Sequence, residues 1–377
     1  MKIGVPSETA EGERRVALTP DVAAKLVGSG LNVLVQAGAG DGSFHSDAEY
    51  QEAGATIVDT AAKLLGEADM VLTVQKPTTE EVGQMREGAG LIGFLYPSSN
   101  IDLVKLLAER RITSFGLDAI PRVARAQSMD ALSSMSSIAG YQAVLIGAGV
   151  LGKYLPMMTT AAGTVPPARV LVLGAGVAGL QAIATARRLG AVVEAYDVRS
   201  AVKEQVESLG ARFIEVAEVE AAESAGGYAR QLDQDTQQRQ REQLQSHLRT
   251  ADIVITTALV PGRPAPVLIT KKMVSAMRAG SVIVDIAAEA GGNCELTEPG
   301  KQVIREGVII CGPPNLASEL SVHASQLYAR NISNLLQHLL KDGELVVDFD
   351  DSITRGCCIT HEGAVVHEAT KALVSQA

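Results

Sequence analysis

The sequence has 377 residues, of which 46% are hydrophobic and 20% charged, and its formal net charge is −10. This composition excludes a disordered or fibrous chain, and the length is typical of a globular protein with roughly two domains. The acidic charge leaves no basic surface for nucleic acid or anionic lipids. The most apolar stretch, from Ala143 onward, is broken by Lys153 and Pro166, so we expect no membrane span.

The cysteines and histidines do not form a metal-binding pattern. The four cysteines lack Cys-x-x-Cys spacing, and the six histidines show no metal-ligand spacing beside them. No signal peptide is recognisable at the N-terminus. We therefore expect a reduced, cytoplasmic protein without a metal site, for which any membrane contact passes through other proteins.

The N-terminal third of the chain alternates β-rich and helical segments. Residues 31–35 and 69–74 have the composition of strands, whereas residues 20–29 and 102–110 have the composition of helices. This alternation predicts a parallel α/β sheet.

Strand-like segments recur in the middle of the chain, at residues 170–173, 192–196, 252–256 and 281–286. Two long helices, expected at residues 129–149 and 319–340, flank this region and mark the points where the chain crosses between domains. The sequence therefore predicts an α/β protein with two Rossmann-like domains and parallel sheets. The first domain would hold residues 1–128 plus 318–377, and the second, a doubly wound fold, residues 129–317.

A segment dense in polar groups lies at the expected boundary between these domains. Four of its side chains offer hydrogen-bond donors and acceptors: Arg122, Gln127, Asp130 and Ser133. Orienting a nicotinamide carboxamide requires both kinds of group, and such ligands usually bind in clefts between domains. Alternatively, Ser128 and Asp130 only cap the following helix and the arginines are solvated. From the residues alone, both interpretations stay open.

A glycine-rich turn follows the first strand of the middle domain. Residues 174–179 read Gly-Ala-Gly-Val-Ala-Gly, and a helical stretch follows from residue 180. Here glycines permit a tight turn, close approach of a pyrophosphate and close packing of helix on strand, while the helix N-terminus offers amides to the phosphates. The pattern predicts a dinucleotide site contacted by Gly174, Ala175, Gly176, Val177 and Gly179.

The second strand of this unit ends at an acidic residue, Asp197, which Val198 and Arg199 follow. An acid about 20 residues beyond the glycine turn accepts hydrogen bonds from the adenosine ribose hydroxyls. The same carboxylate would repel a 2′-phosphate, which favours NAD(H). Arg199 read as a partner for the 2′-phosphate of NADP(H) is the minority interpretation.

A second Gly-x-Gly-x-x-Gly pattern occupies residues 147–152. It is followed by Lys-Tyr-Leu-Pro rather than by a helix and a second strand that ends in an acid. We therefore interpret these glycines as ordinary helix or loop residues.

The connection at residues 221–249 is too long for a tight turn. Its Gln/Arg-rich portion, residues 237–248, has helical propensity, and Gly226-Gly227-Tyr228 has the composition of a flap.

Five segments carry a family resemblance: residues 122–133, 159–168, 178–188, 203–210 and 226–228. They resemble the NAD(H)-binding component, or domain I, of proton-translocating nicotinamide nucleotide transhydrogenase, and the resemblance covers essentially the whole chain. Residues 13–20 and 36–40 are shared with the sister family of alanine dehydrogenases.

The resemblance implies roles for particular residues. Arg122, Gln127, Asp130 and Ser133 would position the nicotinamide, and Tyr228 would lie on a mobile loop that closes over the nucleotide; these five form the catalytic set. The implied cofactor-binding set is Arg122, Val123, Ala124, Arg125, Gln127, Ser128, Met129, Asp130, Gly174, Ala175, Gly176, Val177, Gly179, Asp197, Val198, Arg199, Gly227, Gln240 and Leu259.

The resemblance also implies an activity. Such a component passes hydride between NADH and NADP⁺ bound on a partner component, with Si/Re specificity, and a membrane proton-channel component couples the transfer to proton translocation. Hydride moves between two carbon atoms, so no general acid or base is required. A homodimer is expected, held peripherally at the cytoplasmic face of a membrane by the partner subunits.

The sister family provides a contrast within the first domain. Alanine dehydrogenases carry a catalytic lysine and a histidine where this chain has Gln75 and Tyr96, and an Asp where it has Glu289. Gln does not titrate and Tyr titrates near pH 10, so neither can replace those groups. Lys76, one residue away on the expected strand, would point to the opposite face. Arg15, which grips the substrate carboxylate in that family, is retained, and we expect a structural ion pair for it.

Two alternatives to a transhydrogenase component remain from the sequence. One is an amino acid dehydrogenase that uses Arg15 for the substrate carboxylate. The other is a non-catalytic NAD(H) sensor whose loop closes on the nucleotide to recruit a partner.

Overall fold

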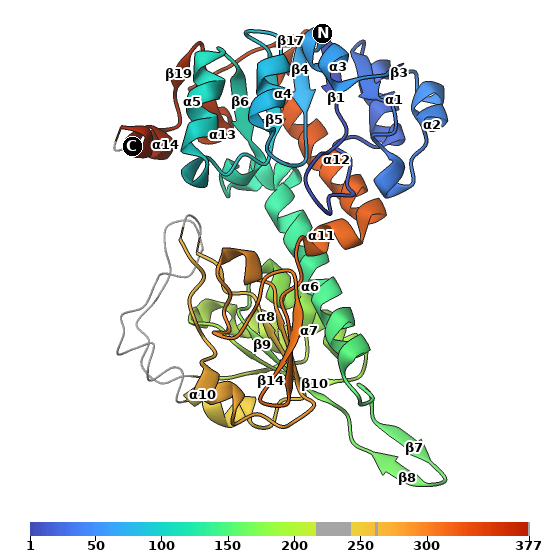
Figure 1. The fold of residues 1–377 in the computed structure, drawn as a ribbon, viewed down its shortest axis with the longest axis vertical. Helices are drawn as coiled ribbons and strands as arrows, with labels where there is room; N and C mark the ends of the chain where they lie inside the picture. The colour runs from blue at the N-terminus through green and yellow to red at the C-terminus, as the bar shows by residue number, and fades with distance from the viewer. Residues whose placement is uncertain (216–242, 261–262, 376–377) are drawn as a thin grey trace. The chain divides into compact units, whose positions relative to one another are not determined.

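The computed structural model of the chain describes residues 1–215, 243–260 and 263–375. The chain divides into two compact units: unit 1 holds Met1–Met135 and Ser318–Ala377, and unit 2 holds Ser136–Ala317 (Figure 1). The first boundary lies inside helix α6 (Ala131–Val150). Because this helix continues without a break, the sequence has no local signal at the position where one unit ends.

Unit 1 is built on an eight-stranded sheet in the order β19-β18-β6-β5-β4-β1-β2-β3. The strands are β1 (Lys2–Val5), β2 (Asn32–Gln36), β3 (Thr56–Val58), β4 (Met70–Leu72), β5 (Gly90–Gly93), β6 (Thr113–Gly116), β18 (Cys358–His361) and β19 (Ala364–Val365). Strands β1 to β6 run parallel, whereas β18 and β19 add an antiparallel edge. The C-terminal segment therefore completes the sheet that the N-terminal segment begins.

The helices of unit 1 are α1 (Pro20–Gly28), α2 (Asp47–Glu52), α3 (Ala61–Glu67), α4 (Thr79–Gln84), α5 (Ile101–Glu109), α12 (Ser321–Leu339), α13 (Ser352–Cys357) and α14 (Glu368–Val374). A short helix, α11 (Leu316–Glu319), spans the second boundary, and the hairpin β16 (Leu340–Lys341) and β17 (Glu344–Leu345) follows α12. Capping boxes begin α2 and α4, where Ser46 and Thr78 each pair with a glutamate three residues later.

Unit 2 contains a seven-stranded sheet in the order β11-β10-β9-β12-β13-β15-β14. Its strands are β9 (Arg169–Leu173), β10 (Val192–Tyr196), β11 (Arg212–Phe213), β12 (Ile253–Thr256), β13 (Val282–Asp285), β14 (Gln302–Arg305) and β15 (Val308–Cys311). Only β14 is antiparallel among these pairings. The helices are α7 (Val177–Arg188), α8 (Lys203–Ser208), α10 (Lys271–Val274) and most of α6.

Strand β9 shows why this sheet is covered on both faces. Val170 and Val172 join one hydrophobic cluster, whereas Leu171 and Leu173 join another, and all four are at most 1% exposed. A strand buried on both sides reads as a continuous apolar run, which is the pattern that predicted it. The predicted fold of two Rossmann-like α/β units is confirmed, with antiparallel edge strands that the sequence pattern did not reveal.

A hairpin of β7 (Met158–Thr160) and β8 (Gly163–Val165) extends from unit 2 beyond its sheet (Figure 1). Among the described residues, no helix combines the length and the apolar character needed to cross a bilayer.

Candidate functional site

The glycine turn of unit 2 lies between β9 and α7, as predicted. Gly174 has φ +102°, a conformation that favours glycine, and its N–H donates to the Tyr196 carbonyl at 2.8 Å. A Cβ at Gly174 would lie 2.5 Å from Oγ1 of Thr257, which itself donates to the Gly174 carbonyl at 3.2 Å. The turn is thus fixed between the ends of β10 and β12.

Two further glycines set the position of helix α7. A Cβ at Gly179 would lie 1.8 Å from the Gly174 carbonyl oxygen, and a Cβ at Gly140 would lie 2.0 Å from the Ala178 carbonyl oxygen. Helices α6 and α7 therefore pack backbone to backbone at the first turn of α7. That turn carries N–H groups with no intrahelical partner, and Val177 on it is 41% exposed. The lack of a Cβ at Gly176 and these amides fit the pyrophosphate of a dinucleotide.

Asp197 follows β10 and is buried, at 9% exposed. Its Oδ2 accepts from the Ala175 N–H at 2.7 Å and from Nη2 of Arg199 at 2.9 Å. Its Oδ1 accepts from the backbone N–H and from Nε of Arg199, both at 2.9 Å. The carboxylate is therefore fixed to the glycine turn, and Arg199 binds it with a two-pronged fork. Val198 between them packs against the hydrophobic cluster of the sheet.

The loop after β12 is held by a buried polar network that sequence reasoning missed. Asn293, fully buried, accepts from the Ala258 N–H at 2.9 Å and donates to the carbonyls of Ala258 and Pro266, both at 2.8 Å. Asp285, also fully buried, accepts from the N–H of Asn293 at 2.8 Å. This network positions the predicted contact residue Leu259, which is 45% exposed.

The second glycine pattern has no such geometry. Gly147 and Gly149 lie within helix α6, and nothing lies within 4 Å of a Cβ built at Gly149. The interpretation of these glycines as ordinary helix residues is confirmed.

In unit 1, the predicted nicotinamide loop forms a short 3-10 helix, η4 (Ala124–Met129), directly before α6. Ala126 and Met129 are buried and anchor it, whereas its polar side chains are exposed. The exposed members of the predicted set are Arg122, Val123, Ala124, Arg125, Gln127 and Ser128. The loop thus presents its donors and acceptors on the surface of unit 1.

Asp130 and Ser133 form the start of α6. The Asp130 carboxylate accepts from the Ser133 N–H at 2.8 Å and from the Ser133 hydroxyl at 2.6 Å. Asp130 therefore caps the helix, one of the two interpretations that the sequence left open. A cap of this kind also fixes the carboxylate for a second task, because its rotamer is determined by the helix.

Helix α12 braces the loop. The side-chain amides of Asn331 and Asn334 donate to the Ser128 carbonyl at 2.8 and 3.0 Å. Arg125 forms an ion pair with Asp351 at 2.9 Å, and His338 of α12 contacts the other oxygen of Asp351 at 2.9 Å. None of these four bracing residues was predicted, because they lie some 200 positions away in sequence and only the fold brings them to the loop.

Arg15 forms the buried ion pair that we expected. Its Nη2 lies 2.6 Å from Oε2 of Glu13, its Nε donates to Oε1 at 2.7 Å, and the two side chains are 3% and 0% exposed. The amide of Gln75 donates to the same carboxylate at 2.8 Å. Burial opposes ionisation of Glu13, but the hydrogen bonds and charge of Arg15 outweigh it and lower the pKa of Glu13 to about 2. Glu13 therefore occupies the guanidinium fork that would hold a substrate carboxylate.

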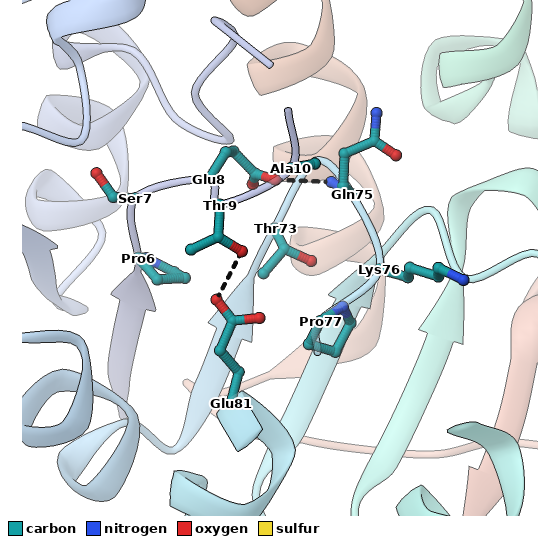
Figure 2. Close-up of a pocket in the computed structure, with 10 residues that line it drawn as sticks. All are labelled: Pro6, Ser7, Glu8, Thr9, Ala10, Thr73, Gln75, Lys76, Pro77 and Glu81. Carbon is teal, nitrogen blue, oxygen red and sulfur yellow. Dashed lines mark hydrogen bonds between the residues drawn. The ribbon is translucent and has the colours of Figure 1, made fainter. Parts of the chain in front are cut away.

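A small pocket adjoins this ion pair at the carboxyl ends of β1 and β4 (Figure 2). Glu8 points into it and accepts from the N–H groups of Val74 at 2.6 Å and Gln75 at 3.0 Å. Burial raises the pKa of Glu8 to about 7, although these two donors oppose the shift. The pocket has room for roughly one water molecule, so it fits neither an amino acid nor a nucleotide.

One expectation from the sequence is wrong here. Strand β4 ends at Leu72, so Gln75 and Lys76 lie in the bend after the strand, and the alternation of strand faces does not decide their directions. Lys76 instead hydrogen-bonds the Asn100 side chain, away from Glu13. Tyr96 has φ +45° and stacks on Phe94 with ring centroids 5.7 Å apart. A group with the properties of the sister family's lysine is absent from the surroundings of Arg15 described above.

Three predicted residues, Gly227, Tyr228 and Gln240, lie outside the described residues. Glu289 lies exposed in the short helix η6 (Ala288–Ala290). Within the described ranges, no cluster of His, Cys, Asp and Glu could hold a metal ion, and the four cysteines are buried and free.

Comparison with known proteins agrees with this geometry. Residues 4–139 match the family described as "Alanine dehydrogenase/PNT, N-terminal domain", and residues 143–368 match its C-terminal domain. The chain is 52% identical to an NAD(P) transhydrogenase subunit alpha of Rhodospirillum rubrum, namely the first of the parts into which that subunit's name divides it, over 98% of each chain.

Solved and curated relatives rank in the same way. A crystal structure of transhydrogenase from Sinorhizobium meliloti is 43% identical, with a TM-score of 0.86 over 98% of this chain and 100% of that one. An alanine dehydrogenase of Halomonas elongata is 36% identical, over 79% of this chain and 76% of its own. The chain therefore belongs to the alanine dehydrogenase/PNT family, in which it is more similar to these NAD(P) transhydrogenase proteins than to that alanine dehydrogenase.

Proposed function

We propose that unit 2 binds NAD(H) at the glycine turn. The observation that carries this proposal is the fixed assembly of Gly174, Gly179 and Asp197, in which the helix N-terminus faces a turn without side chains and a carboxylate stands one hydrogen bond from it. The pyrophosphate would contact Ala175, Gly176 and Val177, and the adenosine ribose would reach Asp197. The carboxylate disfavours a 2′-phosphate, which selects NAD(H) over NADP(H).

The loop of unit 1 supplies the second half of the proposal. Arg122, Gln127, Asp130 and Ser133 orient the nicotinamide carboxamide through their donors and acceptors. The bracing by Asn331 and Asn334 supports this role, because a positioning loop must be held within a fraction of an ångström.

The chemistry proposed is hydride transfer to NADP⁺ held by a partner component. A bound nicotinamide supplies the hydride itself, and the chain's residues act by orienting the ring and excluding water. No proton needs to be removed, so no acid–base pair is required of the residues around the turn. A membrane component couples the transfer to proton translocation, and the chain is peripheral at the cytoplasmic face through these partners.

Reconstitution tests this function. We expect the isolated chain to bind NADH and not NADPH, read from NADH fluorescence, which no Trp obscures. With an NADP(H)-binding component added, hydride transfer should appear and should fall in Gln127→Asn and Asp130→Asn, whereas NADH binding changes less. Transfer of deuterium from each C4 face of labelled NADH reads the Si/Re specificity. Binding of NADPH in preference to NADH contradicts the proposal.

The same experiment separates the two alternatives. An amino acid dehydrogenase would oxidise NADH with pyruvate and ammonium without any partner, which we do not expect because Glu13 occupies the Arg15 fork. A non-catalytic sensor would bind NADH and yet transfer no hydride in the presence of the NADP(H) component.

We also propose that the chain forms a homodimer through the β7–β8 hairpin. A two-stranded hairpin alone is marginally stable in water. All six of its strand residues are exposed, and apolar side chains gather on and beside it, with Tyr154 at 59%, Met157 at 64% and Val165 at 40% exposed. Pairing with a second copy would bury this surface.

A further inference from the structure

The position of Arg199 raises a question for nucleotide binding. Its guanidinium and backbone donate three hydrogen bonds to Asp197, and Ala175 donates a fourth. A carboxylate offers about four lone-pair positions, so these donors fill them. The Asp197 side chain is 6% exposed and that of Arg199 is 13% exposed, so the pair is largely shielded from water.

The fork of Arg199 has the same donor pattern as the ligand. Nε and Nη2 each present one N–H to a different carboxylate oxygen, both at 2.9 Å. The vicinal 2′- and 3′-hydroxyls of a ribose also present two parallel donors to the two oxygens of one carboxylate. Both donor pairs need the same two acceptor positions, whereas the backbone donors of Ala175 and Arg199 can remain in place.

We propose that Arg199 is a specificity-determining residue that occupies the ribose subsite of the free protein and is exchanged for the adenosine ribose diol when NAD(H) binds. The inference rests on the proposed function, because it concerns the same nucleotide. After the exchange the guanidinium stays close to the turn, since Nη2 lies 4.0 Å from the Cβ position of Gly176.

The exchange explains selection against NADP(H) by donor count as well as by charge. A diol replaces two N–H donors with two O–H donors, so Asp197 remains fully hydrogen-bonded. A 2′-phosphate carries no such donor pair and brings negative charge to a buried carboxylate. It could pair with Arg199 only by leaving Asp197 without its partner, which is costly for a buried charge.

The exchange predicts opposite effects for the two residues. Arg199→Met removes the competing fork, so adenosine, which has the diol but no phosphate, should compete with NADH about tenfold more strongly, whereas 2′-deoxyadenosine gains less. Asp197→Ser frees Arg199, so NADPH affinity should rise at least about tenfold relative to NADH. The double variant Asp197→Ser/Arg199→Met should lose that gain.

A direct measurement on the unaltered chain protects the test against misfolded variants. The Nε–H resonance of Arg199 in the ¹⁵N-labelled protein, assigned by its loss in Arg199→Lys, should shift on NADH saturation as the fork leaves Asp197. If NADH binds and the resonance does not move, or if Arg199→Met weakens adenosine binding, the exchange is overturned while the proposed function stands. If the unaltered chain does not bind NADH, the proposed function fails and this inference fails with it.

Discussion

Gly179 and Gly149 belong to similar sequence patterns but have different surroundings. A Cβ at Gly179 would overlap the Gly174 carbonyl oxygen at 1.8 Å, whereas one at Gly149 would meet nothing within 4 Å on an exposed turn of α6. The backbone atom that blocks position 179 belongs to the nucleotide turn itself, so it cannot yield without moving that turn.

We therefore expect opposite outcomes for the same substitution. Gly179→Ala should lower the free energy of unfolding by roughly 1–3 kcal/mol and weaken NADH binding at least about tenfold. The matched control Gly149→Ala should stabilise the chain by about 0.5–1 kcal/mol, because Ala favours a helix, and should leave NADH binding unchanged. Urea unfolding and NADH titration measure both quantities. Equal behaviour of the two variants would contradict the assignment of the turn.

The Glu13–Arg15 pair makes a prediction about acid stability. The folded-state pKa of Glu13, about 2, lies below its ordinary value of 4.5. The folded chain therefore resists protonation, and the associated stability, roughly 3 kcal/mol, is present above pH 4.5 and is lost as the pH falls toward 2. Glu8 has a raised pKa and titrates between pH 4.5 and 7, outside this window.

Urea titrations between pH 5 and pH 3 test this assignment. The fall in the free energy of unfolding should be smaller in Glu13→Gln/Arg15→Met than in the unaltered chain. The double variant avoids leaving a buried guanidinium without its carboxylate. Parallel curves for the two proteins would show that other carboxylates cause the acid loss.

Helix α12 is the element that joins the predicted loop to the rest of unit 1. Asn331, Asn334 and His338 recur on one side of the helix at spacings of three and four residues, so all three reach the loop region. Buried Leu335, Leu336 and Leu339 hold the helix in the core. The loop is therefore braced by an element whose own position is fixed by apolar packing.

Asn331→Ala/Asn334→Ala should reduce hydride transfer about 10- to 100-fold in the reconstituted system, because a loosened loop no longer fixes the nicotinamide. The NADH dissociation constant should change much less, since the glycine turn is intact. Gln337→Ala on the exposed side of the same helix is the control and should transfer hydride normally. If NADH affinity falls as much as transfer, the asparagines bind the nucleotide or stabilise the fold rather than position the loop.

At the scale of the whole molecule, both units share a topological feature. In each sheet the strand order reverses beside the first strand of the unit, between β1 and β4 and between β9 and β12. Ligands of open α/β sheets bind at the carboxyl ends of strands beside such a point. In unit 2 the glycine turn lies there, whereas in unit 1 the chain's own Glu8, Glu13 and Arg15 fill the corresponding place. We infer that the two units divide the work between nucleotide binding and loop support.

The hairpin gives a prediction about assembly. Replacing residues 157–165 with a short Gly-Ser linker should convert the homodimer to a monomer, measured by sedimentation velocity, because the exposed apolar surface is removed. The NADH site should be retained, since the hairpin lies outside the unit 2 sheet. A truncated chain that remains dimeric would place the interface elsewhere.

The sequence by itself determined the features that depend on near neighbours. The buried run 170–173, the glycines at fixed offsets and the acid at the end of β10 encode a strand, a turn and a helix within about 30 residues, a spacing that local physics constrains strongly. The absence of a titrating group at positions 75 and 96 that could serve as the sister family's lysine and histidine do was equally readable, since it concerns residue identity alone.

Only the tertiary structure decided what those residues contact. The Arg199 fork on Asp197 depends on side-chain rotamers, the bracing of Ser128 by Asn331 joins positions 203 residues apart, and Asn293 fixes Ala258 across 35 residues. A hydrogen bond between distant positions leaves no periodicity in the chain, because its geometry exists only after the core has packed. The sequence thus located the nucleotide turn, and the fold determined which residues hold it in place and which one competes for its carboxylate.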